Sequence, residues 1–435
     1  MIDLARRIYS SEALKKAAGT RVVVAGWAAD IKRIGKIAFV RLRDREGEIQ
    51  LTALPDFEKM SELEKIPKES VIVAEGKMAE SKLKSGEKEL VLEKFEVISK
   101  SEPVLPIDFS GKIPTGLDKR LDNRLLDLRN RKNLAIFKIR SGLNAAIRAF
   151  LNSEGFIEIQ TPKLISAGAE GGATLFQVNY YGKKVFLSQS QQLYKQAVLA
   201  SGFDKVFEIG PSFRAEKSHT TRHLTEFTHF DLEMAFIKDE EDVLRLLERL
   251  FVFVIGKIKS EFARELGLFD IHLEPPQLPF PRIRYSEALD MLKEAGSKIK
   301  EDEDIGAEDE KLLGELVKKR YGTKAYFITK FPFKIKPFYI MAENGLSRSF
   351  DFEYGGEELA SGGQREHRYI QLVEQMKGKG LDPKDFAFYL EAFRYGMPPH
   401  GGFGLGIDRL VKNILGLGNI REGVLFPRDP ERVVP

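Results

Sequence analysis

Residues 207–233 read FEIGPSFRAEKSHTTRHLTEFTHFDLE, and this stretch decides the fold. A strand pattern enters it, a polar turn from Lys217 to Thr221 interrupts it, and a second strand pattern leaves it. The stretch therefore predicts a β-hairpin. The buried face of an ordinary hairpin is aliphatic, whereas charged and aromatic side chains alternate here, so we interpret the hairpin as part of a functional site.

The two arms of this hairpin carry polar and aromatic side chains on shared faces. Residues two apart on a strand share a face, which pairs Arg214 with Glu216 on the first arm and places Phe227 beside His229 and Asp231 on the second. No Gly-Lys pair is followed by Ser or Thr, so the chain has no Walker A loop. If ATP binds, arginines must hold its phosphates, because the guanidinium fork binds phosphate oxygens in pairs and keeps its charge.

Outward from the hairpin, the pattern is that of a mixed domain. Apolar residues recur at three and four residues from Leu134 to Leu151, which predicts an amphipathic helix that ends near Gly155. Phe156–Pro162 predicts a strand, and Val243–Val254 predicts a second long helix. Many short strand patterns lie between and after these helices, so we expect an α+β fold in which an antiparallel sheet is flanked by helices.

The first hundred residues carry a different pattern. Five β-rich runs are broken by Gly, Pro and charge clusters: Arg21–Trp27, Ile37–Asp44, Glu48–Ala53, Val71–Gly76 and Glu89–Ile98. Five strands with little helix between them predict a small barrel of the OB-fold type. We expect this barrel over residues 1–103, a hinge or linker over 104–133 and a second domain over 134–435.

Length and composition limit the functions to consider. The chain has 435 residues, more than one hydrophobic core usually supports, and it has no cysteine, which excludes disulfides, thiolate zinc sites and a cysteine nucleophile. Its longest apolar run spans about residues 250–255, far short of the roughly 20 residues of a membrane span. With no apolar signal segment at the N-terminus, we expect a cytoplasmic protein without membrane association. The net charge is only +4, so any RNA-binding surface must be local.

Three segments in this order resemble the motifs of the class II aminoacyl-tRNA synthetases. Phe213–Glu216 resembles motif 2, residues 402–409 (GFGLGIDR) resemble motif 3, and Phe156–Pro162 resembles motif 1. A β-barrel ahead of such a domain is similar to the aspartate, asparagine and lysine subgroup. The absence of a large insertion between motifs 2 and 3 resembles its archaeal and eukaryotic type. Because motif 1 usually lies at a two-fold interface, the resemblance also implies a homodimer.

The resemblance implies an ATP-dependent ligase. An amino-acid carboxylate attacks the α-phosphorus of ATP and releases pyrophosphate, and the 3′ end of a tRNA then takes the aminoacyl group. Arg214 is implied to contact the α-phosphate, Arg409 the γ-phosphate, and Phe227 the adenine ring. The residues implied for ATP are Arg214, Glu216, Arg222, His223, Phe227, Glu358 and Arg409. Glu358 and Ser361 are implied to hold Mg2+, with Asp351 supporting further ions.

The amino-acid pocket resembles that of aspartate-specific members. Residues 190–195 (SQQLYK) place Lys195 where it would reach the side-chain carboxylate of L-aspartate, and Arg365 would supply a second contact. Asp231 agrees, since asparagine-specific members tend to carry glutamate there. The residues implied for aspartate are Glu170, Gln192, Lys195, Arg214, Asp231, Ser361 and Arg365, of which Glu170 and Gln192 would bind the ammonium group. Gln191 replaces a usual proline, and we expect little effect from that departure.

In the barrel, Phe39 and Gln50 match the family positions that stack on and hydrogen-bond the central anticodon base. Stacking combined with an edge-reading amide is a general way to read single-stranded bases. Phe39 could also be a core residue of the barrel. The partners implied are tRNA(Asp) and L-aspartate. The sequence leaves tRNA(Asn) open as a second substrate. Enzymes with one or both tRNA substrates are associated with a bulky residue or a histidine at position 29, and Ala29 is neither.

Three other functions compete with this interpretation. An asparaginyl-tRNA synthetase is disfavoured by Lys195 and Asp231. A non-catalytic RNA-binding paralogue is disfavoured because Arg214, Glu358 and Arg409 are intact. An amidating synthetase that acts on free aspartate would need no anticodon reader, so the barrel argues against it. Zinc is disfavoured as well, since the histidine spacings match no standard ligand pattern.

Overall fold

The computed structural model describes residues 1–81, 87–111, 113–166, 175–215 and 220–435. The chain divides into two compact units, Met1–Ile113 and Pro114–Pro435. This boundary falls inside the segment 104–133, for which the sequence predicts a hinge. Two short helices of that segment, α3 (Leu117–Asp122) and α4 (Arg124–Asp127), belong to the second unit.

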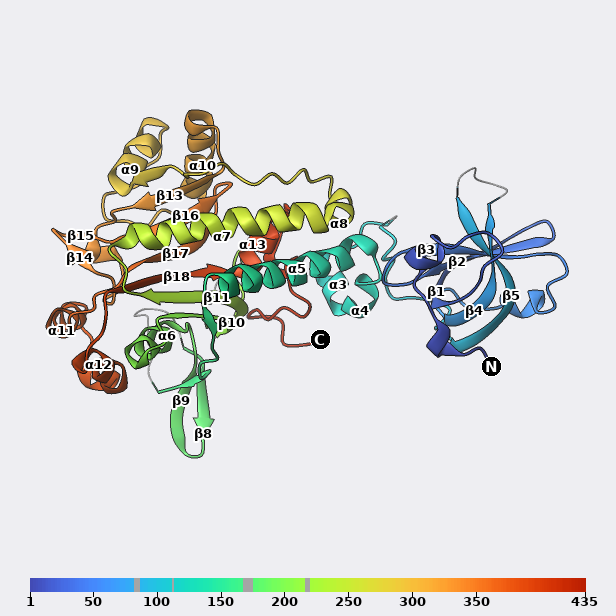
Figure 1. Ribbon diagram of the computed structural model, residues 1–435, viewed down its shortest axis with the longest axis horizontal. Helices are drawn as coiled ribbons and strands as arrows, with labels where there is room; N and C mark the ends of the chain where they lie inside the picture. The colour runs from blue at the N-terminus through green and yellow to red at the C-terminus, as the bar shows by residue number, and fades with distance from the viewer. Residues whose placement is uncertain (82–86, 112, 167–174, 216–219) are drawn as a thin grey trace. The chain divides into compact units, whose positions relative to one another are not determined.

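The first unit is the predicted five-stranded barrel, closed in the order β1-β2-β3-β5-β4 (Figure 1). Its strands are β1 (Arg21–Ile34), β2 (Ile37–Arg43), β3 (Glu48–Ala53), β4 (Val71–Glu80) and β5 (Lys88–Ser99). Alternate side chains point inward, as period-two strands require, so that Val40 and Leu51 lie in the core. Three short helices accompany the barrel: η1 (Leu4–Arg6), α1 (Ser10–Ala13) and α2 (Met60–Leu63).

The second unit is built on an eight-stranded sheet in the order β12-β13-β16-β17-β18-β11-β10-β6. The strands are β6 (Ile157–Glu158), β10 (Lys205–Phe213), β11 (Glu226–Ala235), β12 (Arg282–Arg284), β13 (Ala325–Thr329), β16 (Ser349–Tyr354), β17 (Glu358–Gln364) and β18 (His400–Gly406). Pairing is antiparallel from β13 to β10, but β12 and β6 pair in parallel at the two edges. The sheet is therefore mixed rather than purely antiparallel, because helical connections return the chain to these edges in the same direction.

Two long helices, α5 (Arg131–Ser153) and α7 (Glu240–Glu261), lie side by side over one face of this sheet (Figure 1). Each begins at a polar N-cap, Asn130 or Asp239, whose side chain accepts a hydrogen bond from the first turn. The apolar faces of both helices join Phe230, Phe352 and other sheet residues in the largest core cluster. Alternation along the strands then leaves the neighbouring side chains, Asp231 and Asp351 among them, on the opposite face.

Smaller elements surround this frame. They are β7 (Leu164–Ile165), β8 (Gln177–Tyr180), β9 (Lys183–Leu187), α6 (Gln192–Ala197), η2 (Val198–Ser201), α8 (Ala263–Gly267), α9 (Tyr285–Glu294), α10 (Ala307–Tyr321), η3 (Phe333–Ile335), β14 (Ala342–Glu343), β15 (Leu346–Ser347), α11 (Tyr369–Gly378), η4 (Pro383–Phe386), α12 (Ala387–Arg394), α13 (Ile407–Ile414) and η5 (Ile420–Gly423). Within the described ranges, no helix combines the length and apolar composition needed to cross a membrane.

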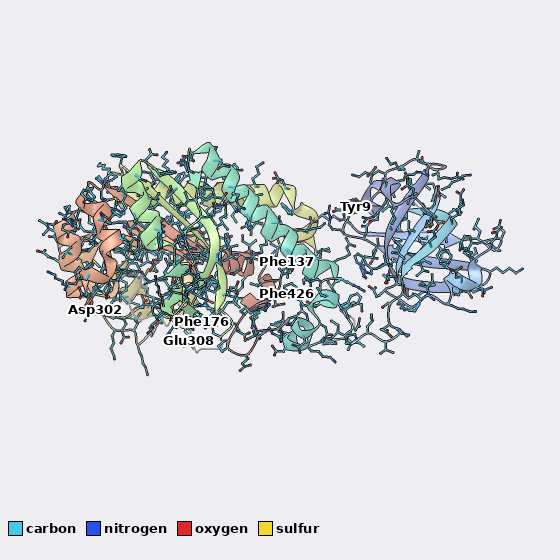
Figure 2. All side chains as sticks on the ribbon, turned by 90° about the horizontal axis from the view of Figure 1, so that it is seen from below. Tyr9, Phe137, Phe176, Asp302, Glu308 and Phe426 are labelled. Atoms are coloured by element: carbon cyan, nitrogen blue, oxygen red, sulfur yellow. The ribbon has the colours of Figure 1, made fainter. Side chains whose placement is uncertain are left out.

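Arg124 ties the start of the second unit to its C-terminal segment. Its guanidinium lies 5.3 Å from the centre of the Phe137 ring on α5 and donates a hydrogen bond of 3.0 Å to the carbonyl of Leu425. Figure 2 labels Phe137 and, next to Leu425 in sequence, Phe426. Asp127 neutralises the buried guanidinium at 2.6 Å, so this buried charge is paired as burial requires.

Candidate active site

A cavity of about 410 Å3 opens on the sheet face turned away from α7. Its walls come from β11, β16, β17 and β18, with further side chains from α6, α10 and the segment around Lys336. The described residues predicted for ATP, Mg2+ or aspartate all line it except Lys195, which pairs with Asp231. These residues are Gln192, Arg214, Arg222, His223, Phe227, Asp231, Asp351, Glu358, Ser361, Arg365 and Arg409.

Glycines allow the strand β18 to form the floor of this cavity. A β-carbon at Gly402 would lie 2.1 Å from the carbonyl oxygen of Leu232 and 2.5 Å from a Glu233 carboxylate oxygen. A β-carbon at Gly404 would lie 2.4 Å from the His229 ring. The glycines of the GFGLG segment thus leave room for the polar side chains of β11.

Lys195 and Asp231 form the innermost ion pair of the site. The ammonium of Lys195 on α6 lies 2.7 Å from Oδ1 of Asp231, 3.5 Å from Oε2 of Glu233 and 3.2 Å from the carbonyl of Phe403. His229 hydrogen-bonds the other oxygen of Asp231. Burial would raise the pKa of Asp231, but His229 and Lys195 outweigh it and hold that pKa below its ordinary value.

Arg365 and Glu233 form a second buried pair beside the first. The guanidinium donates to both oxygens of Glu233, over 2.9 Å and 3.3 Å, and to the amide oxygen of Gln192 over 3.4 Å. Burial lowers the pKa of Arg365, but the opposing charge of Glu233 outweighs it, so the pKa is raised. Glu233 therefore bridges Lys195 and Arg365, because one of its oxygens lies within ion-pair distance of each.

The outer part of the cavity carries the arginines. The guanidinium of Arg214 lies 5.3 Å from the centre of the Phe227 ring, in cation–π geometry. Arg409 on α13 donates to the carbonyl of Glu358 over 3.1 Å. Arg222 is held by Glu310 of α10 at 2.8 Å. Three arginines, an aromatic ring and carboxylates thus line one cavity, an arrangement that suits a purine with a polyphosphate chain.

Carboxylates crowd the wall formed by β16 and β17. Burial, together with the negative charge of Asp351, raises the pKa of Glu358 to about 7. Burial and the nearby charges of Glu310 and Glu358 raise the pKa of Glu353 well above its ordinary value. One oxygen each of Asp351 and Glu353 is buried without a hydrogen-bond partner. Burial and mutual repulsion thus disfavour ionisation of these carboxylates, and a bound cation would offset both effects.

Asp408 fastens the motif 3 helix α13 to the hairpin. It accepts a hydrogen bond of 2.7 Å from the backbone N–H of Thr228 and pairs with Arg140 of α5, which also donates to the hydroxyl of Thr228 over 2.8 Å. The fixed backbone of β11 and α13 thereby sets the relative positions of Phe227 and Arg409.

Comparison with known proteins agrees with this geometry. A family model described as "tRNA synthetases class II (D, K and N)" matches residues 116–430. The chain belongs to the class II aminoacyl-tRNA synthetases. A second family model, described as "OB-fold nucleic acid binding domain", matches residues 22–98 of this synthetase.

Two curated relatives and one solved structure show how close the similarity is. The "Aspartate--tRNA(Asp) ligase" of Pyrococcus furiosus is 50% identical over 439 aligned positions, which cover 99% of this synthetase and 100% of that protein. The "Aspartate--tRNA(Asp/Asn) ligase" of Methanopyrus kandleri is 46% identical over 98% of this chain and 99% of the other. The crystal structure of asparaginyl-tRNA synthetase from Pyrococcus horikoshii complexed with asparaginyl-adenylate aligns over 100% of both chains, with a TM-score of 0.91 and 35% identity. The predicted family and fold are confirmed.

The predicted site residues of this synthetase differ in where the structure places them. The eleven described residues lining the cavity and the adjoining Lys195 are brought together. Glu170 and Glu216 lie outside the described residues. Phe39 and Gln50 belong to the barrel unit: Phe39 is half-buried on β2 outside the core cluster, and Gln50 on β3 donates to Glu89 over 2.6 Å. Gln50 pairs with Arg41, which lies two residues after Phe39 on β2, so Phe39 and Gln50 share the outer face of the barrel.

Several residues of the synthetase site were not predicted. Glu233 shares a hairpin face with His229 and Asp231, so the period-two pattern was the signal that could have assigned it. Gln196 and His400, which extend the network behind Gln192, meet only in the folded chain. Glu310 and Lys336 come from segments without a recognisable motif, and their contacts with Arg222 and Asp351 carry no local signal.

Proposed function

We propose that this synthetase is an aspartate–tRNA ligase, which activates L-aspartate with ATP and transfers it to tRNA(Asp). The single observation that carries the proposal is the pair of buried cations, Lys195 and Arg365, bridged by Glu233 at the inner end of the cavity. The arginines implied for ATP, Arg214 and Arg409, line the same cavity. Curated relatives that share about half of the sequence carry this activity in their names.

The donor groups of the inner end favour aspartate over asparagine. Lys195 and Arg365 carry only N–H donors, so both oxygens of a carboxylate can accept from them, whereas the NH2 group of an amide cannot. Where Lys195 and Arg365 meet the end of the substrate side chain, the near-isosteric amide would leave one of these two donors without an acceptor in a buried setting. Asparaginyl-tRNA synthetase, the competing function, therefore fits this pocket less well.

Activation requires alignment and charge neutralisation. The α-carboxylate of aspartate is already ionised at neutral pH, so it attacks the α-phosphorus without a general base. In our proposal Arg214 binds both the α-phosphate and the attacking carboxylate, Arg409 binds the γ-phosphate, and Phe227 stacks on adenine with Arg222 and His223 beside the phosphates. Gln192 and Ser361 bind the amino-acid substrate, and Asp231 holds Lys195 in place. These groups stabilise charge that develops on the phosphoryl oxygens.

Mg2+ fits the carboxylate wall. Asp351 and Glu353 each have a buried oxygen without a partner, and burial together with neighbouring carboxylates raises the pKa values of Glu353 and Glu358. We assign the ion to Glu358 and Ser361. Mg2+ in such sites usually takes one or two protein carboxylates and completes its shell with substrate phosphates and water. When bound, Mg2+ supplies Lewis-acid stabilisation of phosphate charge.

The barrel is proposed as the anticodon reader, with Phe39 and Gln50 contacting the central base. Relatives named for tRNA(Asp) alone and for both tRNA(Asp) and tRNA(Asn) are about equally similar to this chain, so both tRNAs are candidate substrates. We also propose a cytoplasmic homodimer formed through motif 1 around β6, whose outer edge ends the sheet.

The test is amino-acid-dependent pyrophosphate exchange with purified protein, ATP and Mg2+, supplying aspartate, asparagine and lysine separately. Exchange with aspartate alone, abolished in Lys195→Leu, supports the proposal. Exchange with asparagine would assign the pocket to the amide, and exchange with none of the three would favour an RNA-binding paralogue.

A further inference from the structure

A chain of buried hydrogen bonds runs from His400 to the aspartate pocket. Nδ1 of His400 lies 2.8 Å from the carbonyl oxygen of Pro398, and its Nε2 lies 2.8 Å from the amide nitrogen of Gln196. The amide oxygen of Gln196 accepts from Gln192 over 2.7 Å. Gln192 in turn accepts from Arg365 through its amide oxygen over 3.4 Å. The chain thus ends at the residue assigned to the substrate ammonium.

The direction of each hydrogen bond in this series follows from the groups at its two ends, the Pro398 carbonyl and the Arg365 guanidinium. A carbonyl can only accept, so Nδ1 of His400 carries the proton and Nε2 is a bare acceptor. The Gln196 NH2 group must therefore point at His400, which turns its oxygen towards Gln192. The Gln192 NH2 group must point at that oxygen, which turns the Gln192 oxygen towards Arg365 and the cavity.

A second donor holds the same orientation of Gln196. The hydroxyl of Tyr389 on α12 donates to the Gln196 oxygen over 3.2 Å. His400, Gln196 and Tyr389 are fully buried, so water does not replace a misdirected partner. Reversing either amide would place two donors or two acceptors face to face in a dry interior, where a polar group without a partner is unfavourable.

We propose that His400 is a positioning residue for amino-acid recognition. Its neutral Nδ1–H tautomer fixes the amide of Gln196 and through it the amide of Gln192, so that Gln192 presents an oxygen to the substrate ammonium. An ammonium has only donors and needs such an acceptor, whereas a reversed Gln192 amide would turn its NH2 group to it. This inference rests on the proposed aspartate activation and adds to it a residue behind the pocket wall.

The test compares L-aspartate with succinate, which has the same two carboxylates but no ammonium group. Aspartate KM is measured by pyrophosphate exchange, and succinate binding by its inhibition of that exchange. In His400→Leu and Gln196→Met, we expect the aspartate KM to rise about 10-fold while the succinate inhibition constant and the ATP KM stay unchanged. His400→Gln can offer an amide oxygen at the position of Nε2, so it is expected to recover most of the aspartate affinity.

Phe393→Leu is the matched control, because Phe393 packs against the His400 ring, 6.0 Å between ring centres, without a polar atom. It is expected to change neither ligand. Equal weakening of aspartate and succinate in the His400 variant would assign His400 to core structure alone, and no change in either ligand would also overturn the inference. If no amino acid supports pyrophosphate exchange by the wild-type protein, the proposed function is wrong and the inference that rests on it is overturned as well.

Discussion

The ammonium of Lys195 lies 2.7 Å from Oδ1 of Asp231, and about 2% of each side chain is exposed. Lys195 is thus held in place by its own protein before any substrate arrives. A substrate carboxylate at this point meets a lysine that is already oriented, so that little side-chain entropy is lost on binding. The buried pair supports recognition of aspartate as well as the fold.

Lys195→Met separates these two roles. Removing the lysine takes one of the two partners named above from the buried Asp231 and leaves His229, so we expect the free energy of unfolding to fall by about 3 kcal/mol and aspartate-dependent exchange to be lost. The double variant Lys195→Met/Asp231→Asn is expected to recover much of the stability and none of the exchange. Urea unfolding and exchange assays measure the two effects, and recovery of both together would contradict the assignment of Lys195 to substrate.

Arg409→Ala tests the nucleotide end. We expect kcat of exchange to fall by about 100- to 1,000-fold, because one charge-stabilising donor is lost from the reacting phosphates. Arg245→Ala, which removes an exposed arginine of α7 paired with Asp242, is the control and should leave kcat unchanged. A similar loss in both variants would point to a general effect of charge.

Phe39→Ala tests the anticodon reader. Stacking on a base contributes about 1–3 kcal/mol, so we expect the KM for tRNA to rise by about 10- to 100-fold in aminoacylation. Pyrophosphate exchange without tRNA should stay at the wild-type rate, since the barrel carries none of the proposed adenylation residues. Val71→Ala, at a half-buried residue of β4, serves as the control for a shortened barrel side chain. Unchanged tRNA KM in Phe39→Ala would remove Phe39 from the recognition surface.

His400 makes the stability depend on pH. Burial lowers its pKa from 6.5 to about 4, with Glu233 opposing this shift and Arg365 and His367 supporting it. Between these two values the unfolded chain binds a proton that the folded protein does not, so stability falls as the pH drops from about 6.5 towards 4. We expect this group to account for about 1–2 kcal/mol of lost stability at about pH 5. Urea unfolding at about pH 7 and pH 5 should therefore show a smaller loss in His400→Gln than in the wild type, and equal losses would contradict this assignment.

Local patterns predicted most of the fold, because strand and helix periods are properties of neighbouring residues. The five barrel strands, the two long helices and the shared face of Phe227, His229 and Asp231 follow from periods of two and 3.6. The parallel edges of the sheet depend on which strands meet after helical connections, and the sequence carries no local record of that. The burial of Lys195 could not be predicted from the sequence either, since α6 has only six residues and too few turns for an amphipathic pattern.

The strand β18 has a consequence for how this pocket can change. Where it faces Glu233 and His229 it presents main chain, and even a methyl group at Gly402 or Gly404 would collide with a neighbour. Substitutions at these two glycines therefore cannot reshape this side of the pocket without displacing β11. A related enzyme that prefers another amino acid must acquire that preference through side chains of α6 and β11. The substitutions that separate the two enzymes in specificity are therefore expected in those two elements.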